Sequence, residues 1–338
     1  MGPRSPVRHR RSTVRKVVGV SVALATVAAL AAGCGGGGSG SGSGSSGGLT
    51  DVNVGYVAFD DAAVLFLATE KGIFAKHGLK VKLFEAASPT PIVASMVSGQ
   101  YQFGFVTTPV LINTNLGGQK LKCVSVVDGQ VDPNSDSAAF VASAKSGVTN
   151  PAQLSGKTIG VVQLSSINLL EAKKIAEDAG AKNEKFVAIP FPQMPQALAD
   201  GRIQAAVVTS PFLQIALKAG AKPLAYPNSQ LFPNGTVYCF GATAKYLSGN
   251  AKTAQQFQDA INETTVYAKT HLTEEKATLV KYLKLSAADA QAQEIASNYI
   301  PELNVQSISQ TQDLMKQQGA IKSTVDPNSL IWTPPSSN

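Results

Sequence analysis

The sequence predicts an α/β fold in which two similar lobes, each a mostly parallel sheet flanked by helices, face a shared ligand cleft. Two observations carry this prediction. A twelve-residue pattern occurs twice, at residues 98–109 and 200–211, with five identical positions, and internal similarity of this kind marks a repeated structural unit. The chain also has 338 residues and 44% apolar composition, which is enough for two lobes with their own cores.

Each copy of the pattern has the same order of elements. Gly99 or Gly201 ends a helix, because glycine readily adopts the left-handed conformation needed there. The apolar runs at 103–106 and 205–208 are too short for helices and suit buried parallel strands. A proline then opens the next helix at its first position.

Hydroxyl residues stand between strand and proline in both copies, as Thr107 and Thr108 in the first and Thr209 and Ser210 in the second. Ligands of open α/β sheets bind at the carboxyl ends of the strands. The alternative is that these residues only cap the following helices. Their presence at matching positions in both copies favours the cleft.

The other elements follow from apolar runs bounded by glycine, proline and polar turns. The expected strands are residues 51–59, 79–84, 103–106, 121–127, 158–162, 186–189, 205–208 and 236–241. The expected helices are residues 62–71, 92–98, 109–116, 168–179, 196–200, 253–270, 273–283, 287–298 and 307–318. The last four have apolar spacings of three to four residues, which predicts that one face of each is buried against the first lobe.

The net charge of +7 comes mostly from the N-terminus. Six cations precede residue 34 in a stretch without acids, so the remainder carries about +1 (7 − 6). Nucleic-acid binding needs a basic face on the folded domain, and this charge distribution speaks against it. The six residues are Arg4, Arg8, Arg10, Arg11, Arg15 and Lys16.

These cations, the apolar run at 17–32 and the small residues at 31–33 have the form of a secretory signal over residues 1–33. With Cys34 directly after it, the segment resembles a bacterial lipoprotein signal. That resemblance implies lipidation of Cys34 and a place on the outer face of the cytoplasmic membrane. Residues 34–48 are a Gly/Ser tether. An ordinary signal peptide or an uncleaved anchor are the alternatives, and the apolar run is short for a spanning helix.

Two cysteines remain after Cys34. Cys123 and Cys239 both lie in apolar, strand-like runs. Outside the cytosol such a pair is either oxidised to a disulfide or kept as two buried thiols, and the sequence leaves both alternatives open.

Two further motifs carry a family resemblance. The first places a glycine after a helix and then an aromatic residue and Gly-Leu-x-Val, at Ala68, Gly72, Phe74, Gly78, Leu79 and Val81. The second is Leu-Ser-Gly-Lys-Thr-Ile-Gly at residues 154–160. Both resemble the substrate-binding proteins of ABC importers, within them the nitrate/sulfonate/taurine and thiamine-pyrimidine group. The resemblance covers the chain from about residue 50 to its end.

This resemblance implies a type II periplasmic-binding-protein-like fold. Lobe 1 would comprise residues 49–144 and 237–338, and lobe 2 residues 145–236, with hinges near 143–147 and 234–236. The protein would capture a small organic molecule by hinge closure and deliver it to an ABC permease and its ATPase. It is expected to be a monomer without a cofactor.

No catalytic set is visible in the sequence. The three histidines, His9, His77 and His271, have no partners at metal-ligand or triad spacing, and no glycine-rich phosphate loop follows a strand. We therefore expect a binding protein without a metal site. The candidate ligand-binding residues are Phe59, Asp60, Asp61, Ser88, Thr107, Thr108, Gln163, Ser165, Ser166, Phe191, Thr209, Ser210 and Phe212.

The candidate residues favour a nitrogenous ring as ligand. Helix N-termini with hydroxyl groups suit an anion such as a sulfonate or taurine, but Asp60 and Asp61 would repel one and would suit amine or amidine donors. Phe59, Phe191 and Phe212 could stack on a flat ring, as in a thiamine-pyrimidine precursor. The structural alternatives are N-cap carboxylates for the aspartates and core packing for the phenylalanines.

Two other functions remain as alternatives. One is a ligand-sensing lipoprotein for a membrane receptor. The other is an enzyme on the same fold, similar to pyrimidine synthases of thiamine biosynthesis. Those enzymes carry a cysteine-rich run with a nearby histidine, whereas Cys239 stands alone here and a secretion signal is present, so the enzyme ranks lower.

Overall fold

A computed structural model of the chain describes Gly2 and residues 48–126, 136–233, 235, 237–293 and 304–335. Residues 47–338 form one compact unit, and the account below concerns this unit. The predicted signal peptide, Cys34 and most of the tether lie outside the described residues. So does the end of the helix predicted at 287–298.

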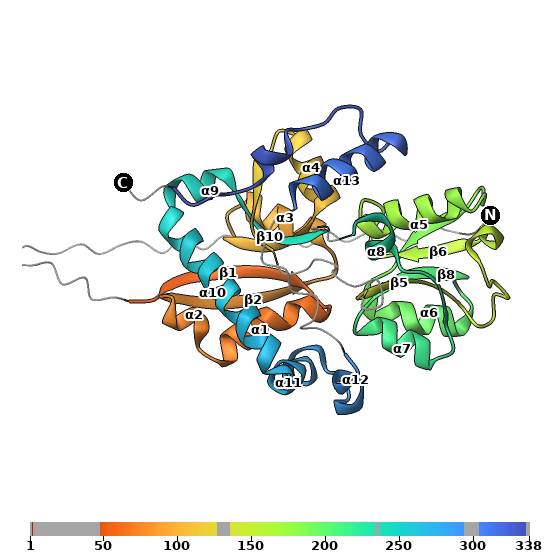
Figure 1. Cartoon of the computed structure of the whole chain (residues 1–338), viewed down its shortest axis with the longest axis horizontal. Coiled ribbons are helices and arrows are strands. Elements are labelled where there is room, and N and C mark those ends of the chain that lie inside the picture. Colours follow the sequence, from red (N-terminus) through yellow and green to blue (C-terminus); the bar gives the residue numbers. More distant parts are fainter. Residues whose placement is uncertain are drawn as a thin grey trace, which may run out of the picture. The chain divides into compact units, whose positions relative to one another are not determined.

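The first sheet has five strands in the order β2-β1-β3-β10-β4. Of these, β1, β2 and β10 are labelled in Figure 1. β1 pairs in parallel with β2 and β3, and β10 runs antiparallel to both β3 and β4. The strands are β1 (Thr50–Val57), β2 (Leu79–Ala86), β3 (Phe103–Thr107), β4 (Leu121–Val126) and β10 (Tyr238–Thr243).

The second sheet repeats this arrangement in the order β7-β6-β8-β5-β9. β6 pairs in parallel with β7 and β8, and β5 runs antiparallel to β8 and β9. The strands are β5 (Ala138–Ala142), β6 (Thr158–Val161), β7 (Lys185–Ala188), β8 (Ala205–Thr209) and β9 (Lys222–Ala225). In each sheet the one antiparallel strand is fourth, and the repeated sequence supplies the central strand, β3 or β8.

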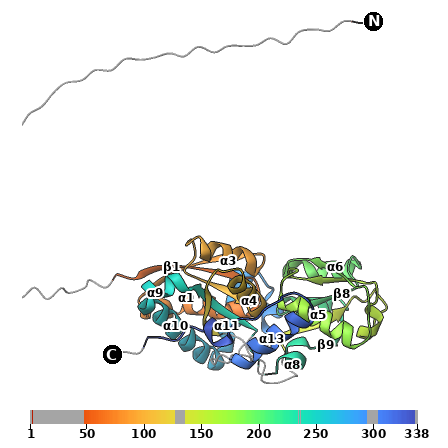
Figure 2. The same ribbon diagram turned by 90° about the horizontal axis from the view of Figure 1, so that it is seen from above.

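Helices surround both sheets, and Figure 2 shows α5 and α6 beside β8, with α13 next to α5. Around the first sheet lie α1 (Ala63–Glu70), α2 (Ile73–Lys76), α3 (Pro89–Val97), α4 (Thr108–Leu116), α9 (Ala244–Gly249), α10 (Ala251–Thr270), α11 (Leu272–Leu283), α12 (Ala287–Gln291) and α13 (Val305–Gln317). Around the second lie α5 (Ile167–Asp178), α6 (Met194–Asp200), α7 (Phe212–Lys218) and α8 (Pro227–Leu231).

The strand β5 shows where the domain boundary differs from the sequence expectation. The expected first lobe ran to residue 144, with a hinge near 143–147, but β5 pairs with β8 and β9 of the second sheet. The chain therefore passes between the sheets after Val126 and before Ala138. The return strand β10 lies in the first sheet, as expected.

Two helices also differ from expectation. Helix α3 begins at Pro89, three residues ahead of the predicted start, because prolines fit the first turn of a helix, where no N–H partner is needed. Helix α8, which follows the strand β9, is absent from the helices expected from the sequence. Trp332 is 7% exposed, and its backbone N–H donates to the carbonyl of Cys123.

The central strand β3 separates small from aromatic side chains. A Cβ added at Gly104 would lie 2.2 Å from Ile92 of α3, so the glycine lets α3 pack closely on that face. The neighbouring Phe103 points to the other face, where its ring stacks on Phe257 of α10 with centroids 4.1 Å apart. One strand therefore fixes helices on both faces of the first sheet.

The structure explains why the repeat keeps its glutamine. Gln102 accepts a hydrogen bond from the N–H of Asn53 at 2.8 Å, and its amide donates to the carbonyl of Gly99. Gln204 does the same with Thr158 at 3.1 Å and Gly201. In both sheets the glutamine side chain joins the turn before the central strand to the adjacent parallel strand, β1 or β6. The glycine of that turn has a left-handed conformation.

Cys123 in β4 and Cys239 in β10 are joined by a disulfide with Cα atoms 5.9 Å apart. Both residues are buried, and their strands are neighbours in the first sheet. The structure thus favours the bonded alternative. Because 116 positions separate the two cysteines, the closed loop contains the whole second sheet.

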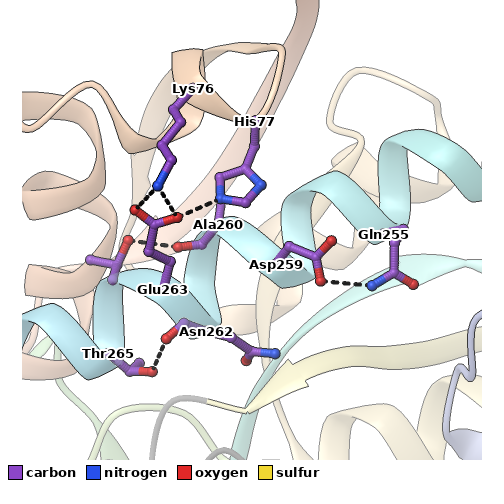
Figure 3. Close-up of polar contacts among 9 residues, drawn as sticks. Lys76, His77, Gln255, Asp259, Ala260, Asn262, Glu263 and Thr265 are labelled. Carbon is purple, nitrogen blue, oxygen red and sulfur yellow. Dashed lines mark hydrogen bonds and ion pairs between the residues drawn. The ribbon is translucent and has the colours of Figure 1, made fainter.

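A surface ion-pair cluster fixes the turn of the family-like motif to α10 (Figure 3). Lys76 contacts both oxygens of Glu263 at 2.8 and 2.9 Å, and His77 Nε2 lies 2.9 Å from one of them. His77, which the sequence leaves without a partner, therefore has one on α10. Hydrogen bonds from Lys76 and then His77 lower the pKa of Glu263.

We expect Glu263→Gln to lose stability only where the carboxylate is charged. Because its pKa is lower in the folded chain, Glu263 contributes stability above its ordinary pKa of 4.5, and this is lost as the pH falls through the lowered value. Screening at this partly exposed site keeps the loss below about 1 kcal/mol. Urea unfolding at pH 7 and at acid pH measures it.

The matched control is Asp259→Asn on the same helix, whose carboxylate accepts from the Gln255 amide (Figure 3). It removes the same charge without removing a cation partner. An equal, pH-independent loss in both variants would contradict the assignment.

Candidate functional site

The loops after β1 and β8 meet where the two sheets adjoin. The N–H of Asp60 donates to the carbonyl of Ser210 at 3.0 Å, and the N–H of Ser210 donates to the carbonyl of Ser137 at 2.8 Å. The carboxyl ends of the parallel strands of both sheets therefore face each other, as the repeat predicts. The region where the loops after β1 and β8 meet is called the seam here.

The four hydroxyl residues of the repeat are all buried at this seam. Thr209 donates to the carbonyl of Ser137 at 3.3 Å, and Ser210 donates to Gln214 at 2.9 Å. Thr107 stands at the N-cap of α4 without a side-chain capping bond, and its hydroxyl oxygen has no hydrogen-bond partner among the described residues. Capping therefore does not account for Thr107.

Three residues after β6 have different tasks. Ser166 is an N-cap, because its oxygen accepts from the N–H of Leu169 at the start of α5. Gln163 accepts from the hydroxyl of Thr90, which belongs to α3 beside the first sheet, at 3.2 Å and donates to Ser165 at 3.0 Å. Gln163 thus links the loop after β6 to α3, while Ser165 is exposed.

The two aspartates lie in a short 3-10 turn, η1 (Asp60–Ala62), and each is 1% exposed. The N-cap of α1 is Ala62, so neither carboxylate holds that position. Both carboxyl groups are therefore buried in the loop after β1, next to the loop after β8.

Of the three candidate phenylalanines, Phe59 and Phe212 are packed in the core and Phe191 lines a cavity. Phe59 packs on Phe105 and Tyr238, with centroids 4.5 and 5.7 Å away, which is the core role. Phe212 is buried at the start of α7. Phe191, in the turn η4 (Phe191–Gln193), lines a cavity.

That cavity, of about 300 Å³, lies between the two sheets' strand ends and is called the rim cavity here. Val57, Ala58 and residues 85–87 form the side at β1 and β2. Residues 190–193, Pro-Phe-Pro-Gln, form the opposite side.

A second cavity, of about 270 Å³, lies between α3, α4 and the loop after β6. Thr90, Asn113, Thr114 and Ser165 supply its polar groups. Of the predicted site residues, Ser165 lines this cavity and Phe191 lines the rim cavity. Ser88, the N-cap of α3, lines neither.

Glu85 is a residue that the sequence analysis missed. It is the penultimate residue of β2 and lines the rim cavity. Burial and then the Glu85 carboxylate raise the pKa of Tyr56 to about 12, so the phenol stays protonated and donates to Glu85 at 3.4 Å. β2 has alternating apolar and polar residues and is partly exposed, and an acidic residue is common on such a strand. The sequence therefore does not indicate that Glu85 lines a cavity.

Asp136 was also missed, and its role is to hold the crossing into the second sheet. Its carboxylate accepts from the N–H of Ala138, the Asn228 amide, and the N–H and hydroxyl of Ser229, at 2.9–3.1 Å. Burial raises the pKa of this carboxyl above its ordinary range. The contacts fix α8 to the start of β5.

Within the described residues, no group of three or more His, Cys, Asp or Glu side chains is placed to hold a metal ion. Cys239, the cysteine considered for an enzyme-like site, is in the disulfide and 4% exposed. Among the same residues, no helix has both the length and the apolar character needed to cross a membrane.

Comparison with known proteins agrees with the two-lobed architecture. The family model described as "NMT1/THI5 like" matches residues 60–275. No functionally curated protein matches the sequence.

Solved structures match most of the chain at low identity. The alkanesulfonate-binding protein SsuA of Xanthomonas axonopodis pv. citri, bound to MOPS, has a TM-score of 0.71 at 18% identity, covering 84% of this chain and 99% of that one. The aliphatic sulphonate-binding SsuA of Escherichia coli has a TM-score of 0.68 at 19% identity, covering 85% and 94%. The nitrate-binding NrtA of Synechocystis PCC 6803 has a TM-score of 0.69 at 15% identity, covering 83% and 85%. The fold is that of periplasmic binding proteins.

Proposed function

The chain belongs to the NMT1/THI5-like family, and from this premise we propose that it is the extracytoplasmic solute-binding component of an ABC importer. The observation that carries the proposal is the meeting of two matching strand-end systems at one seam, with a cavity of about 300 Å³ between them. Structurally similar proteins are named as binding components for sulfonates and nitrate.

The mechanism is capture by hinge closure. The chain passes between the two sheets twice, after Val126 and before Tyr238, so bending at these crossings moves one lobe against the other. A solute that contacts both sides of the cleft stabilises the closed form. The closed protein then delivers it to a permease, which works with an ATPase.

The ligand in this proposal is a small molecule with a nitrogenous ring, and a sulfonate or taurine-like anion is the competing class. Glu85, which lines the rim cavity, supports the nitrogenous ring. The chain acts as a monomer that a lipid on Cys34 holds at the outer face of the cytoplasmic membrane. Mass spectrometry of the mature N-terminus tests this anchor, since lipidation adds diacylglycerol to Cys34.

A thermal-shift screen tests the function. The purified chain is unfolded and refolded to remove bound solute and then heated with sulfonates, nitrate, aminopyrimidines, flavins and amino acids. Dose-dependent stabilisation by one compound is expected, because a ligand bound only by the folded state raises its stability. Stabilisation by taurine but by no nitrogenous ring would overturn the ligand class, and no stabilisation by any compound would count against a binding protein for these solutes.

A further inference from the structure

We propose that the rim cavity binds a planar, positively charged nitrogen group of the solute, of the amidinium or guanidinium kind, with Glu85 as its charge partner. This inference rests on the proposed function and names the chemistry of the ligand within it. Nothing in the family motifs of the sequence points to Glu85, which lies outside both motifs and outside the repeat.

The shape of the cavity suits a flat group. On one side stand the small side chains of Ala58, Ala86 and Ala87, and on the other stands the Pro190-Phe191-Pro192 wall. A planar cation between such surfaces keeps van der Waals contact on both faces, and an aromatic wall adds attraction to positive charge.

The charged residue in the lining of the cavity favours a positively charged ligand. Glu85 is the one charged residue among those lining either described cavity, and no lysine or arginine lines them. Within the described part of the chain Glu85 has no ion pair with a lysine or arginine. Its contact is the hydrogen bond from Tyr56, which leaves carboxylate acceptor positions for a bidentate donor.

The neighbouring helix ends offer few donors to an anion. Prolines occupy the first turns of α3 and α4, as Pro89, Pro91 and Pro109, and proline has no N–H. The N–H of Thr108 donates to the carbonyl of Val237. An anion at the starts of α3 and α4 would therefore find few backbone donors to offset repulsion by the Glu85 carboxylate.

Three probes of equal size test the inference on the whole chain: benzamidine, benzamide and benzoate. They share one ring and differ in carrying a positive, zero or negative charge. Isothermal titration with wild type should give benzamidine a dissociation constant at least about tenfold below that of benzamide, with benzoate the weakest. A tenfold change is about 1.4 kcal/mol.

The test variant is Glu85→Gln, which keeps the shape of the side chain and one acceptor oxygen and removes the charge. It should lose the preference for benzamidine over benzamide. The matched control is Glu177→Gln on the exposed end of α5, which changes the net charge equally outside the cavity and should bind as wild type does. Circular dichroism of each variant checks that it is folded.

The outcomes separate this inference from the proposed function. Benzoate binding as tightly as benzamidine, an unchanged preference in Glu85→Gln, or an equal loss in Glu177→Gln would each overturn the inference. So would the absence of binding by all three probes. In each case a solute found in the broader thermal-shift screen would leave the binding function standing, and only failure of that screen would count against the function.

Discussion

Replacing both Cys123 and Cys239 by alanine is expected to lower the free energy of unfolding by about 4 kcal/mol. The disulfide joins two cysteines that are 116 positions apart in the sequence. Cross-linking a loop on the order of 100 residues removes more entropy from the unfolded chain than cross-linking a short loop. The buried bond also joins β4 to β10, the strands through which the chain leaves and re-enters the first sheet. Urea unfolding of the variant and of wild type under oxidising conditions measures the difference.

Two controls accompany this comparison. Wild type unfolded in the presence of a thiol reductant should approach the stability of the double variant, since both lack the cross-link. Ser125→Ala, in the same strand, removes a buried hydroxyl that has no hydrogen-bond partner among the described residues and should leave stability close to wild type. A double variant within about 1 kcal/mol of wild type would show that the cross-link adds little beyond the packing of the two side chains.

Phe257→Ala is expected to cost about 3–5 kcal/mol of folding stability. The side chain is fully buried, on the face of α10 that meets the first sheet. Its ring stacks on Phe103 at 4.1 Å and lies edge-on to Phe240 at 5.9 Å. Its removal leaves a cavity between helix and sheet and removes these contacts and the stacking on Phe74 at 6.0 Å, so the thermal midpoint and the urea midpoint should both fall.

The matched control is Phe84→Ala in β2. That ring also stacks on an aromatic neighbour, Tyr101 at 5.1 Å, but it is 37% exposed. Truncating it removes a ring contact without leaving a closed cavity, so the expected loss is only about 1 kcal/mol. If Phe257→Ala lost no more than Phe84→Ala, α10 would not be anchored through this ring.

The sequence predicts the parts of this fold that local patterns encode. The duplicated pattern around Gly99 and Gly201 gives the central strands of both sheets and the seam at their carboxyl ends, because turn chemistry and strand length are local properties. The apolar run at β5, Ala138–Ala142, is buried along its whole length. Such a run can pair with either sheet, so only the three-dimensional pairing decides which lobe it joins.

The sequence likewise predicts some positions in the candidate site and not others. The hydroxyls of Thr107 and Thr209 lie at the seam, as the repeat predicts, because their positions follow from the ends of the repeated strands. Phe59 was considered for ring stacking but packs on Phe105 and Tyr238, since an aromatic residue after a buried strand fits core and ligand roles equally. Glu85 gains its place only when η4 approaches the end of β2, which no local pattern records.

The position of β10 in the first sheet has a consequence for the order in which the two lobes fold. All strands of the second sheet come from Ala138–Ala225, so its pairings are complete within one continuous segment. The first sheet needs β10 between β3 and β4, across a gap of more than 100 residues. Contacts so distant in the chain form slowly and only after the later segment has been synthesised. We infer that the second lobe folds first, and pulsed hydrogen exchange should find the amides of β6 and β8 protected before those of β3 and β10.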